Sequence, residues 1–307
     1  MATFEALRGT AGVVTGAGGG IGAAIAQTLA GYGAAVIVND VGARLDGAAT
    51  GHHPADSVVA SIVAAGGRAV ADAGDVTQAA AVGAMVDRCR REFGRLDFAI
   101  HNAGILRDAI FHKMTEADFD AVVAVHLKGA FLLSQAAAQV FRKQGHGALV
   151  HMTSTSALCG NLGQANYAAA KLGVVALVRS IALDLRRSNV RCNAVAPFAW
   201  TRMTESIPWS EDPAQRARMA ALQQCKPEMV AELVAWLVSD AARAVTGQVF
   251  AVRGGELTLF ELPKPKRQLL RAGGWTAAAL EQLWPELQDD AVPLRTSGEV
   301  FAALPVT

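Results

Sequence analysis

The sequence predicts an α/β fold in which a parallel sheet is covered by helices on both faces. Short runs rich in β-branched residues alternate with longer, Ala-rich segments of helical periodicity, the pattern of βαβ units. The strand-like runs lack strict polar alternation, as expected for a sheet that is buried on both sides. A glycine cluster between the first strand and the first helix is a third indication of this class.

The predicted elements follow one another as strand and helix from residue 12 to residue 252. The seven strands are expected at residues 12–15, 35–40, 68–72, 96–101, 148–153, 190–195 and 248–252. The helices between them are expected at residues 21–32, 55–65, 78–93, 116–142, 165–187 and 226–239. Because parallel strands need such crossovers, the seven strands are expected to form one doubly wound sheet.

Two segments break this alternation. Residues 42–53 are Gly-rich and are expected to form a surface loop after the second strand. From residue 254 the alternation stops, and a single short helix is expected around residues 276–287, with the rest irregular. We therefore expect one domain over residues 1–253 and a C-terminal extension over residues 254–307.

The composition excludes several classes of protein. The chain has 307 residues, 28 Lys and Arg against 27 Asp and Glu, and 52% hydrophobic residues. This content of apolar residues is too high for a disordered chain, and the near-zero net charge gives no sign of nucleic-acid binding. The four cysteines form no CxxC pair, so neither a zinc site nor a disulfide framework is expected.

No export signal or membrane span is expected. The N-terminus has no basic segment followed by a long apolar one. The most apolar stretch, residues 121–141, carries His126, Lys128 and Gln135, which suits a buried helix better than a membrane-spanning one. A cytoplasmic protein with reduced thiols is the expectation.

The glycine cluster predicts a dinucleotide site. Glycine lets the backbone turn tightly and lets a pyrophosphate approach the N-terminus of the first helix, where free N–H groups point outward. The residues expected to contact the cofactor here are Thr15, Gly16, Gly18, Gly20, Ile21 and Gly22.

Asp40 predicts a preference for NAD over NADP. It closes the second strand, eighteen positions after Gly22, where a carboxylate can accept hydrogen bonds from the adenosine ribose and repel a 2′-phosphate. The nearest arginine is Arg44. The alternative is a solvated aspartate at the end of a strand.

Tyr167 and Lys171 predict an acid–base pair. Residues four apart share one face of a helix, and an ammonium close to the phenol is expected to lower its pKa from about 10. Ser154 ends the preceding strand, thirteen residues before Tyr167, where its hydroxyl can bond a substrate oxygen. A tyrosine and a lysine at this spacing also occur together by chance, so the combination with the glycine cluster carries the argument.

Six motifs in order resemble the classical short-chain dehydrogenases/reductases. The motifs are TGAGGGIG at 15–22, Asp75-Val76, Asn102-Ala103-Gly104, Ser154, Tyr167-x-x-x-Lys171 and NAVAP at 193–197, and they cover residues 8–252. The resemblance implies a single Rossmann-type domain, a bound nicotinamide cofactor and a homodimer or homotetramer paired through segments 116–142 and 165–187. It implies that Tyr167 transfers the proton, that Lys171 holds the nicotinamide ribose and that Ser154 orients the reacting oxygen. The cofactor contacts that it adds are Asp75, Val76, Asn102, Ala103, Gly104, Pro197 and Thr201.

His126 departs from the family pattern. It stands in VHLKG at 125–129, where the family usually has an asparagine that holds a water in a proton relay. Imidazole can also hold a water or pass a proton. The alternative is a histidine that is simply packed among helices.

A narrower resemblance suggests the substrate. VNDV at 38–41, HNAGILRD at 101–108, GNLGQANY at 160–167 and the sequence around His126 resemble the (3R)-hydroxyacyl-CoA dehydrogenase domain of the peroxisomal D-bifunctional protein. This implies reversible oxidation of a 3-hydroxyacyl-CoA. The alternatives are a reductase of 3-oxoacyl carriers, steroids or other ketones, and a non-catalytic dinucleotide-binding scaffold.

The substrate is expected to lie under an apolar lid. Residues 198–225 are rich in large apolar side chains, among them Phe198, Trp200, Met203, Ile207, Pro208, Trp209, Met219 and Leu222. Leu158, Cys159 and Leu162 are expected on the opposite wall, with Cys159 as a small hydrophobe. Lys264, Lys266, Arg267 and Arg271 are either contacts for a CoA phosphate or simply solvated.

Overall fold

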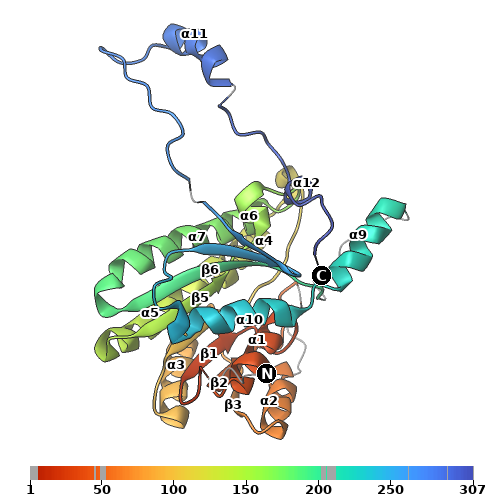
Figure 1. Cartoon of the computed structure of the whole chain (residues 1–307), viewed down its shortest axis with the longest axis vertical. Coiled ribbons are helices and arrows are strands. Elements are labelled where there is room, and N and C mark those ends of the chain that lie inside the picture. The colour runs from red at the N-terminus through yellow and green to blue at the C-terminus, as the bar shows by residue number, and fades with distance from the viewer. Residues whose placement is uncertain are drawn as a thin grey trace.

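The computed structural model describes residues 6–44, 46–48, 53–201, 205, 212–261, 263–288 and 290–306. Its centre is one sheet with the strand order β3-β2-β1-β4-β5-β6-β7-β8, in which all neighbours are parallel except β7 and β8 (Figure 1). The strands are β1 Ala11–Thr15, β2 Ala35–Asn39, β3 Arg68–Asp72, β4 Phe98–His101, β5 Gly147–Met152, β6 Val190–Phe198, β7 Val249–Arg253 and β8 Glu256–Leu259. The predicted α/β class and the seven parallel strands are confirmed.

Helices cover both faces of the sheet. Apolar side chains of the first face pack with α1, α2 and α10, and those of the second face pack with α3, α5 and α7. The helices are α1 Gly20–Gly31, α2 Pro54–Ala64, α3 Ala79–Phe93, α4 Glu116–Val123, α5 Gly129–Gln144, α6 Thr155–Cys159, α7 Ala165–Asp184, α9 Pro213–Gln223, α10 Pro227–Val238, α11 Ala277–Gln288 and α12 Ser297–Val300. These two layers exclude water from the central strands β1, β2, β4, β5 and β7, which explains why these strands read as continuous apolar runs.

The eighth strand was not predicted. β8 follows β7 through Gly254 and Gly255 and pairs with it in the antiparallel direction. Gly254 has a φ of +59°, a conformation that glycine adopts without strain. The sequence therefore contained a two-residue hairpin signal that the expectation of an irregular tail overlooked.

The predicted helix 116–142 is interrupted in the structure. One π-helical turn, Ala124–Lys128, separates α4 from α5 and contains His126. Such turns widen the helix by one residue and often occur at functional sites. Hydrophobic periodicity continues through the turn and therefore does not reveal it.

Two helical stretches, Glu116–Gln144 and Ala165–Asp184, are long and apolar enough to cross a membrane by length and composition alone. Core helices of soluble proteins pass the same test. Here both stretches cover the second face of the sheet, and Leu133 and Val174 of these helices are fully buried in its core. The packing against the sheet explains their apolar character.

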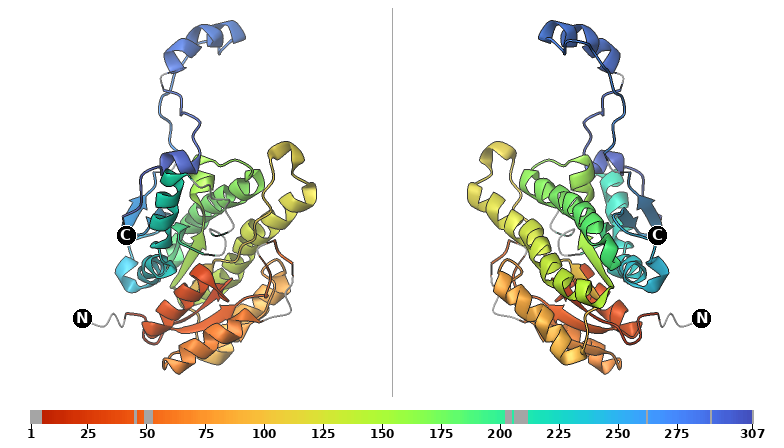
Figure 2. Two further views of the ribbon diagram at one scale, coloured as in Figure 1. Left: turned by 90° about the vertical axis from the view of Figure 1, so that its right-hand side faces the viewer. Right: turned by 90° about the vertical axis from the view of Figure 1, so that its left-hand side faces the viewer.

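The C-terminal region leaves the body of the protein and returns to it. After β8 the chain runs out to α11, which corresponds to the helix predicted around residues 276–287, and comes back to α12 beside α6 (Figures 1 and 2). In all three views α11 lies at the tip of this projecting arm. β8 extends the sheet beyond residue 253. The domain boundary expected at that residue stays a prediction.

Candidate active site

A cavity of about 570 Å³ lies at the carboxyl ends of the strands. It is centred where the sheet order switches between β1 and β4, the position at which open α/β sheets bind ligands. Most residues predicted for the site line this cavity: Gly16, Gly20, Ile21, Asp40, Asp75, Val76, Asn102, Ala103, Gly104, His126, Tyr167, Lys171, Pro197 and Thr201. Thr15, Gly18, Gly22 and Ser154 do not line it and support residues that do, as described next.

The glycine loop is packed so closely that side chains are excluded from it. Gly16 has a φ of +61°, and a Cβ there would lie 2.6 Å from Ala103 Cα. A Cβ on Gly22 would lie 2.1 Å from Gly16 O. The residue that precedes α1 is Gly19, which has no side chain to cap the first N–H groups of the helix. These N–H groups therefore face the cavity and suit an anionic ligand such as a pyrophosphate.

Thr15 joins the glycine loop to the end of β4 from below. Its Oγ1 accepts hydrogen bonds from the backbone N–H groups of Asn102 at 3.1 Å and Ala103 at 3.2 Å. Asn102 Nδ2 donates in turn to Gly16 O at 2.9 Å. Thr15 is fully buried, so it fixes the two loops relative to each other without lining the cavity.

Backbone groups orient the carboxylate of Asp40. Its Oδ2 accepts from Gly18 N at 2.9 Å and its Oδ1 accepts from Gly42 N at 2.8 Å. Gly18 thus belongs to the site through Asp40. Arg44 also lines the cavity and forms an ion pair with Asp46. The carboxylate is consequently the fixed charge at the end of β2.

Tyr167 and Lys171 project from consecutive turns of α7. Lys171 Nζ lies 5.7 Å from the centroid of the Tyr167 ring and donates a hydrogen bond to Met152 O at 2.7 Å. Thr153 Oγ1 donates to Lys171 O at 2.8 Å and ties the helix to the end of β5. Only 3% of the Lys171 surface is exposed. The ammonium is therefore held at one position beside the phenol.

Ser154 lies next to Tyr167 and caps the short helix α6. Its Oγ accepts from Ser156 N at 3.2 Å, which leaves the hydroxyl proton of Ser154 to be donated elsewhere. A hydrogen bond with Ser154 also acts on Tyr167 and favours its ionised form. The structure thus brings the three predicted catalytic residues Ser154, Tyr167 and Lys171 together.

The pKa of Tyr167 differs from the expectation. Burial raises it to about 12 despite the hydrogen bond with Ser154, whereas the sequence predicted that Lys171 would lower it. Burial also lowers the pKa of Lys171 to about 7. Desolvation disfavours the charged form of both groups, and the charge of Asp108 adds to the rise at Tyr167. The prediction of an acidified phenol was therefore wrong for the protein without a ligand.

His126 reaches the same site from the π-helical turn. Its ring meets that of Tyr167 edge-on, with centroids 5.1 Å apart, and its Nε2 lies 2.8 Å from Ile105 O. Burial, followed by the charge of Lys171, holds the pKa of His126 well below its usual value. Nδ1 is buried and has no hydrogen-bond partner within the described residues. The imidazole is therefore neutral, with one nitrogen left for a water or a ligand.

Two further histidines below the site were missed by the sequence analysis. His101 and His151 are paired in the register of β4 and β5 and are fully buried. His101 Nδ1 lies 3.2 Å from Thr15 Oγ1, and its Nε2 lies 3.1 Å from Val125 O in the π-helical turn. His101 thus connects the glycine loop with the turn that carries His126. The signal in the sequence that could have identified them is a histidine at the end of a strand that is expected to be buried.

The expected substrate lid is only partly described. Met203, Ile207, Pro208 and Trp209 lie outside the described residues, as do residues 45 and 49–52 of the loop expected at 42–53. On the opposite wall, burial raises the pKa of Cys159, which agrees with a small hydrophobe in place of a nucleophile. The lid stays a prediction.

The basic residues of the tail make contacts within the arm. Lys266 and Arg267 form ion pairs with Asp290, Lys264 pairs with Glu261, and Arg271 lies over the ring of Trp275. All of them lie on the segment that leads to α11 (Figure 2). The described residues contain no group of His, Cys, Asp and Glu that could hold a metal ion.

Comparisons with known proteins agree with this geometry. A family model described as an enoyl-(acyl carrier protein) reductase matches residues 16–256. A putative short-chain type dehydrogenase/reductase of Mycobacterium tuberculosis is 45% identical over 80% of this chain and 82% of its own length. A hydroxyacyl-CoA dehydrogenase of the same organism is 39% identical over 87% of this chain and 84% of its own length.

Two further comparisons cover the peroxisomal enzymes and a solved structure. The peroxisomal multifunctional enzyme type 2 of Mus musculus is 38% identical over 90% of this chain but only 36% of its own length. The crystal structure of a short chain dehydrogenase from Mycobacterium avium superposes with a TM-score of 0.82 at 40% identity, covering 95% of this chain and 98% of that one. Both resemblances predicted from the sequence are confirmed. The chain belongs to the short-chain dehydrogenase/reductase family, whose dehydrogenases use a nicotinamide cofactor, and it is an oxidoreductase that acts on CH–OH groups.

Proposed function

We propose that this protein is an NAD-dependent dehydrogenase that interconverts a 3-hydroxyacyl-CoA and the corresponding 3-oxoacyl-CoA. The observation that carries the proposal is that Tyr167 and Lys171 line the cavity that also holds the glycine loop and Asp40, with Ser154 beside Tyr167. The acyl-CoA substrate rests on the hydroxyacyl-CoA dehydrogenase of Mycobacterium tuberculosis, which is similar over most of both chains. A homo-oligomer and a cytoplasmic location are part of the same proposal.

The cavity fits a nicotinamide dinucleotide. Glycines replace side chains where a pyrophosphate would approach α1, and the first N–H groups of that helix are free of a side-chain cap. Asp40 would accept hydrogen bonds from the adenosine ribose and disfavour a 2′-phosphate, which supports NAD as the preferred form. Asp75 and Val76 would contact the adenine, and Asn102 to Gly104, Pro197 and Thr201 would line the path to the nicotinamide.

Tyr167 is the proton acceptor for alcohol oxidation. Its Oη takes the proton of the substrate hydroxyl, while the hydrogen on the carbinol carbon leaves with its electron pair. A bound oxidised nicotinamide would supply the acceptor for that hydride and a positive charge beside the phenol. Ser154 donates its hydroxyl proton to the substrate oxygen when substrate is bound and keeps that oxygen within reach of Tyr167.

Lys171 and His126 complete the arrangement. Lys171 Nζ has N–H groups besides the one that bonds Met152 O, and these can hold a ribose hydroxyl. Its ammonium favours the tyrosinate, the form of Tyr167 that accepts the substrate proton and becomes neutral tyrosine. The proton bound by Tyr167 leaves through a water at His126 Nδ1, which has no partner among the described residues. In ketone reduction the same groups act in reverse, and the raised pKa of Tyr167 keeps the proton in place for donation.

The decisive experiment compares substrates and cofactors with the purified protein. The substrates are 3-hydroxyacyl-CoAs of increasing chain length, each mixed with NAD. We expect the absorbance of reduced nicotinamide to rise over time, at rates well above those measured with NADP. The match to an acyl-carrier-protein reductase model gives the second candidate, a reductase of 3-oxoacyl carriers. Higher kcat/KM with NADH and a 3-oxoacyl carrier protein than with any acyl-CoA would favour that candidate.

A further inference from the structure

The chain returns from the projecting arm through a segment that we call the C-terminal strap, residues 296–306. It begins with α12, whose first turn is fixed by reciprocal hydrogen bonds between Thr296 and Glu299. In Figures 1 and 2 α12 lies beside α6, the short helix that starts directly after Ser154. The strap therefore reaches the short helix that Ser154 caps.

One residue of the strap holds both ends of α6. The Oγ atoms of Ser297 and Thr155 are hydrogen-bonded at 2.7 Å, and Ser297 N donates to Gly160 O at 2.8 Å. Both hydroxyl side chains are buried, with 8% and 6% of their surface exposed. Thr155 is the first residue of α6 and Gly160 follows its last residue. Since so short a helix is not stable alone, these bonds fix its place.

The other end of the strap is tied to the sheet and to α9. The buried guanidinium of Arg253 donates to Phe301 O at 3.0 Å and to Ala303 O at 2.8 Å, and it is paired with Glu256. Arg218 of α9 donates to Gly298 O at 3.3 Å and to Phe301 O at 3.4 Å. The strap thus connects α6 with β7 and with the described part of the region predicted to cover the substrate.

We propose that Ser297 is a positioning residue that acts through Thr155 on Ser154. Ser154 caps α6, so a shift of α6 moves the hydroxyl that orients the substrate oxygen. This inference rests on the proposed role of Ser154 in the dehydrogenase reaction. The glycine loop and Asp40 are held by separate bonds, and cofactor binding is therefore independent of the strap.

The test is Ser297→Ala in the full chain. This variant removes the hydroxyl and keeps the backbone bond to Gly160. We expect kcat/KM for a 3-hydroxyacyl-CoA to fall about tenfold, mainly through kcat, because small displacements of orienting groups are costly in rate. The dissociation constant of NAD should stay within about twofold. Ser297→Thr, which retains a hydroxyl, should restore most of the rate.

A second pair of variants isolates the bond itself. Thr155→Val should reproduce the loss, and the double variant Thr155→Val, Ser297→Ala should be no slower than either single one. Ser239→Ala is the matched control, since it removes a buried serine hydroxyl bonded to Trp236 O, on the loop after α10. Its turnover should equal that of the wild type. Additive losses in the double variant would overturn the proposal.

Hydrogen exchange separates this proposal from the proposed function. In Ser297→Ala the amides of residues 154–160 should exchange faster, whereas those of β1 and β4 should not change. If the wild type turns over no 3-hydroxyacyl-CoA, the proposed function fails and the exchange result still decides on the strap. Unchanged exchange at 154–160, or equal losses of turnover, melting temperature and NAD binding, would overturn the positioning role.

Discussion

The imidazole of His126 stands edge-on to the phenol ring of Tyr167, with 5.1 Å between the ring centroids. The contact exists because one π-helical turn, Ala124–Lys128, widens the helix by one residue, and because Nε2 is held at 2.8 Å from Ile105 O. It places a neutral ring, whose Nδ1 has no partner in the described part of the chain, next to the proposed proton acceptor. His126 thus lies where the proposed function needs a relay group.

Replacement of His126 by leucine should slow the reaction by about tenfold to a hundredfold, since it removes both ring nitrogens and leaves an apolar side chain of similar reach. His126→Asn, which restores a polar group, should retain more activity. Steady-state kinetics with NAD would measure both. Full turnover by His126→Leu, with normal NAD binding, would show that the ring only packs.

Tyr167→Phe should reduce turnover by about a thousandfold, because the proton acceptor is lost while the ring remains. NAD binding, measured by calorimetry, should change little. The other tyrosine of the chain, Tyr32, provides a matched control. Its hydroxyl donates to Glu232 at 2.6 Å, and neither residue lines the cavity. Tyr32→Phe should keep wild-type turnover, and equal effects of the two substitutions would contradict the assigned role.

Asp40→Ala should weaken the binding of NAD by about tenfold or more, since the hydrogen bonds between the carboxylate and the ribose are lost. Binding of NADP should weaken less or improve, because the charge that repels its phosphate is gone. The ratio of the two dissociation constants is the measurement. Asp56→Asn, an exposed substitution on α2, serves as the control and should leave that ratio unchanged.

The buried lysine predicts a pH dependence of stability. Burial lowers the pKa of Lys171 from 10.5 to about 7. Between these values the unfolded chain binds a proton that the folded protein has released, so this group makes the free energy of unfolding rise with pH, by at most about 1.4 kcal/mol per pH unit. Urea unfolding without ligand should show a flatter pH dependence in Lys171→Met. Identical slopes of the free energy of unfolding against pH in the wild type and in Lys171→Met would contradict the lowered pKa of Lys171.

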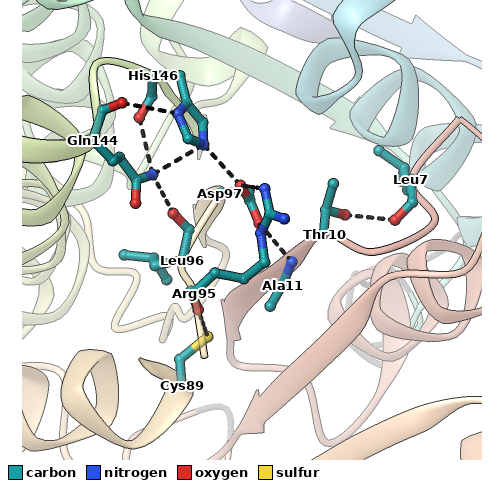
Figure 3. A network of polar contacts seen from close by, with 9 residues as sticks. All are labelled: Leu7, Thr10, Ala11, Cys89, Arg95, Leu96, Asp97, Gln144 and His146. Carbon is teal, nitrogen blue, oxygen red and sulfur yellow. Dashed lines mark hydrogen bonds and ion pairs between the residues drawn. The ribbon is translucent and has the colours of Figure 1, made fainter. Parts of the chain in front are cut away.

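A polar network at the opposite ends of the strands is predicted to support the fold. Asp97 accepts hydrogen bonds from Ala11 N at 2.8 Å, from Arg95 Nε at 2.6 Å and from His146 Nε2 at 2.9 Å (Figure 3). Burial opposes its ionisation, but the hydrogen bonds from Arg95, Ala11 N and His146 lower the pKa of Asp97. The ionised carboxylate therefore joins β1 to the start of β4.

Asp97→Asn should destabilise the protein by about 2 kcal/mol at neutral pH, as several charge-assisted bonds are weakened. Because the folded pKa is lowered, the stabilisation exists above the ordinary aspartate pKa and disappears as the pH falls through the folded value. The difference in the free energy of urea unfolding between Asp97→Asn and the wild type should therefore shrink in acid. Asp87→Asn breaks only an exposed ion pair with Arg90 and should have little effect.

The parallel part of the sheet and most of the cavity lining could be predicted, because strands and glycine loops leave local patterns. The position of His126 beside Tyr167 depends on a π-helical turn, which apolar periodicity does not reveal. The hydrogen bond between Thr155 and Ser297 joins residues 142 positions apart and has no local signal. The direction of the Tyr167 pKa was missed because burial is a property of the packed structure.

Asp40 is immobilised before any ligand arrives, because the N–H groups of Gly18 and Gly42 each hold one of its oxygens. Its rotamer entropy has been given up during folding, so a ribose that binds there does not have to restrain a freely rotating side chain. The negative charge cannot swing aside to admit a phosphate. In the proposed function, discrimination between the two dinucleotides therefore rests on a carboxylate whose position the fold has already set.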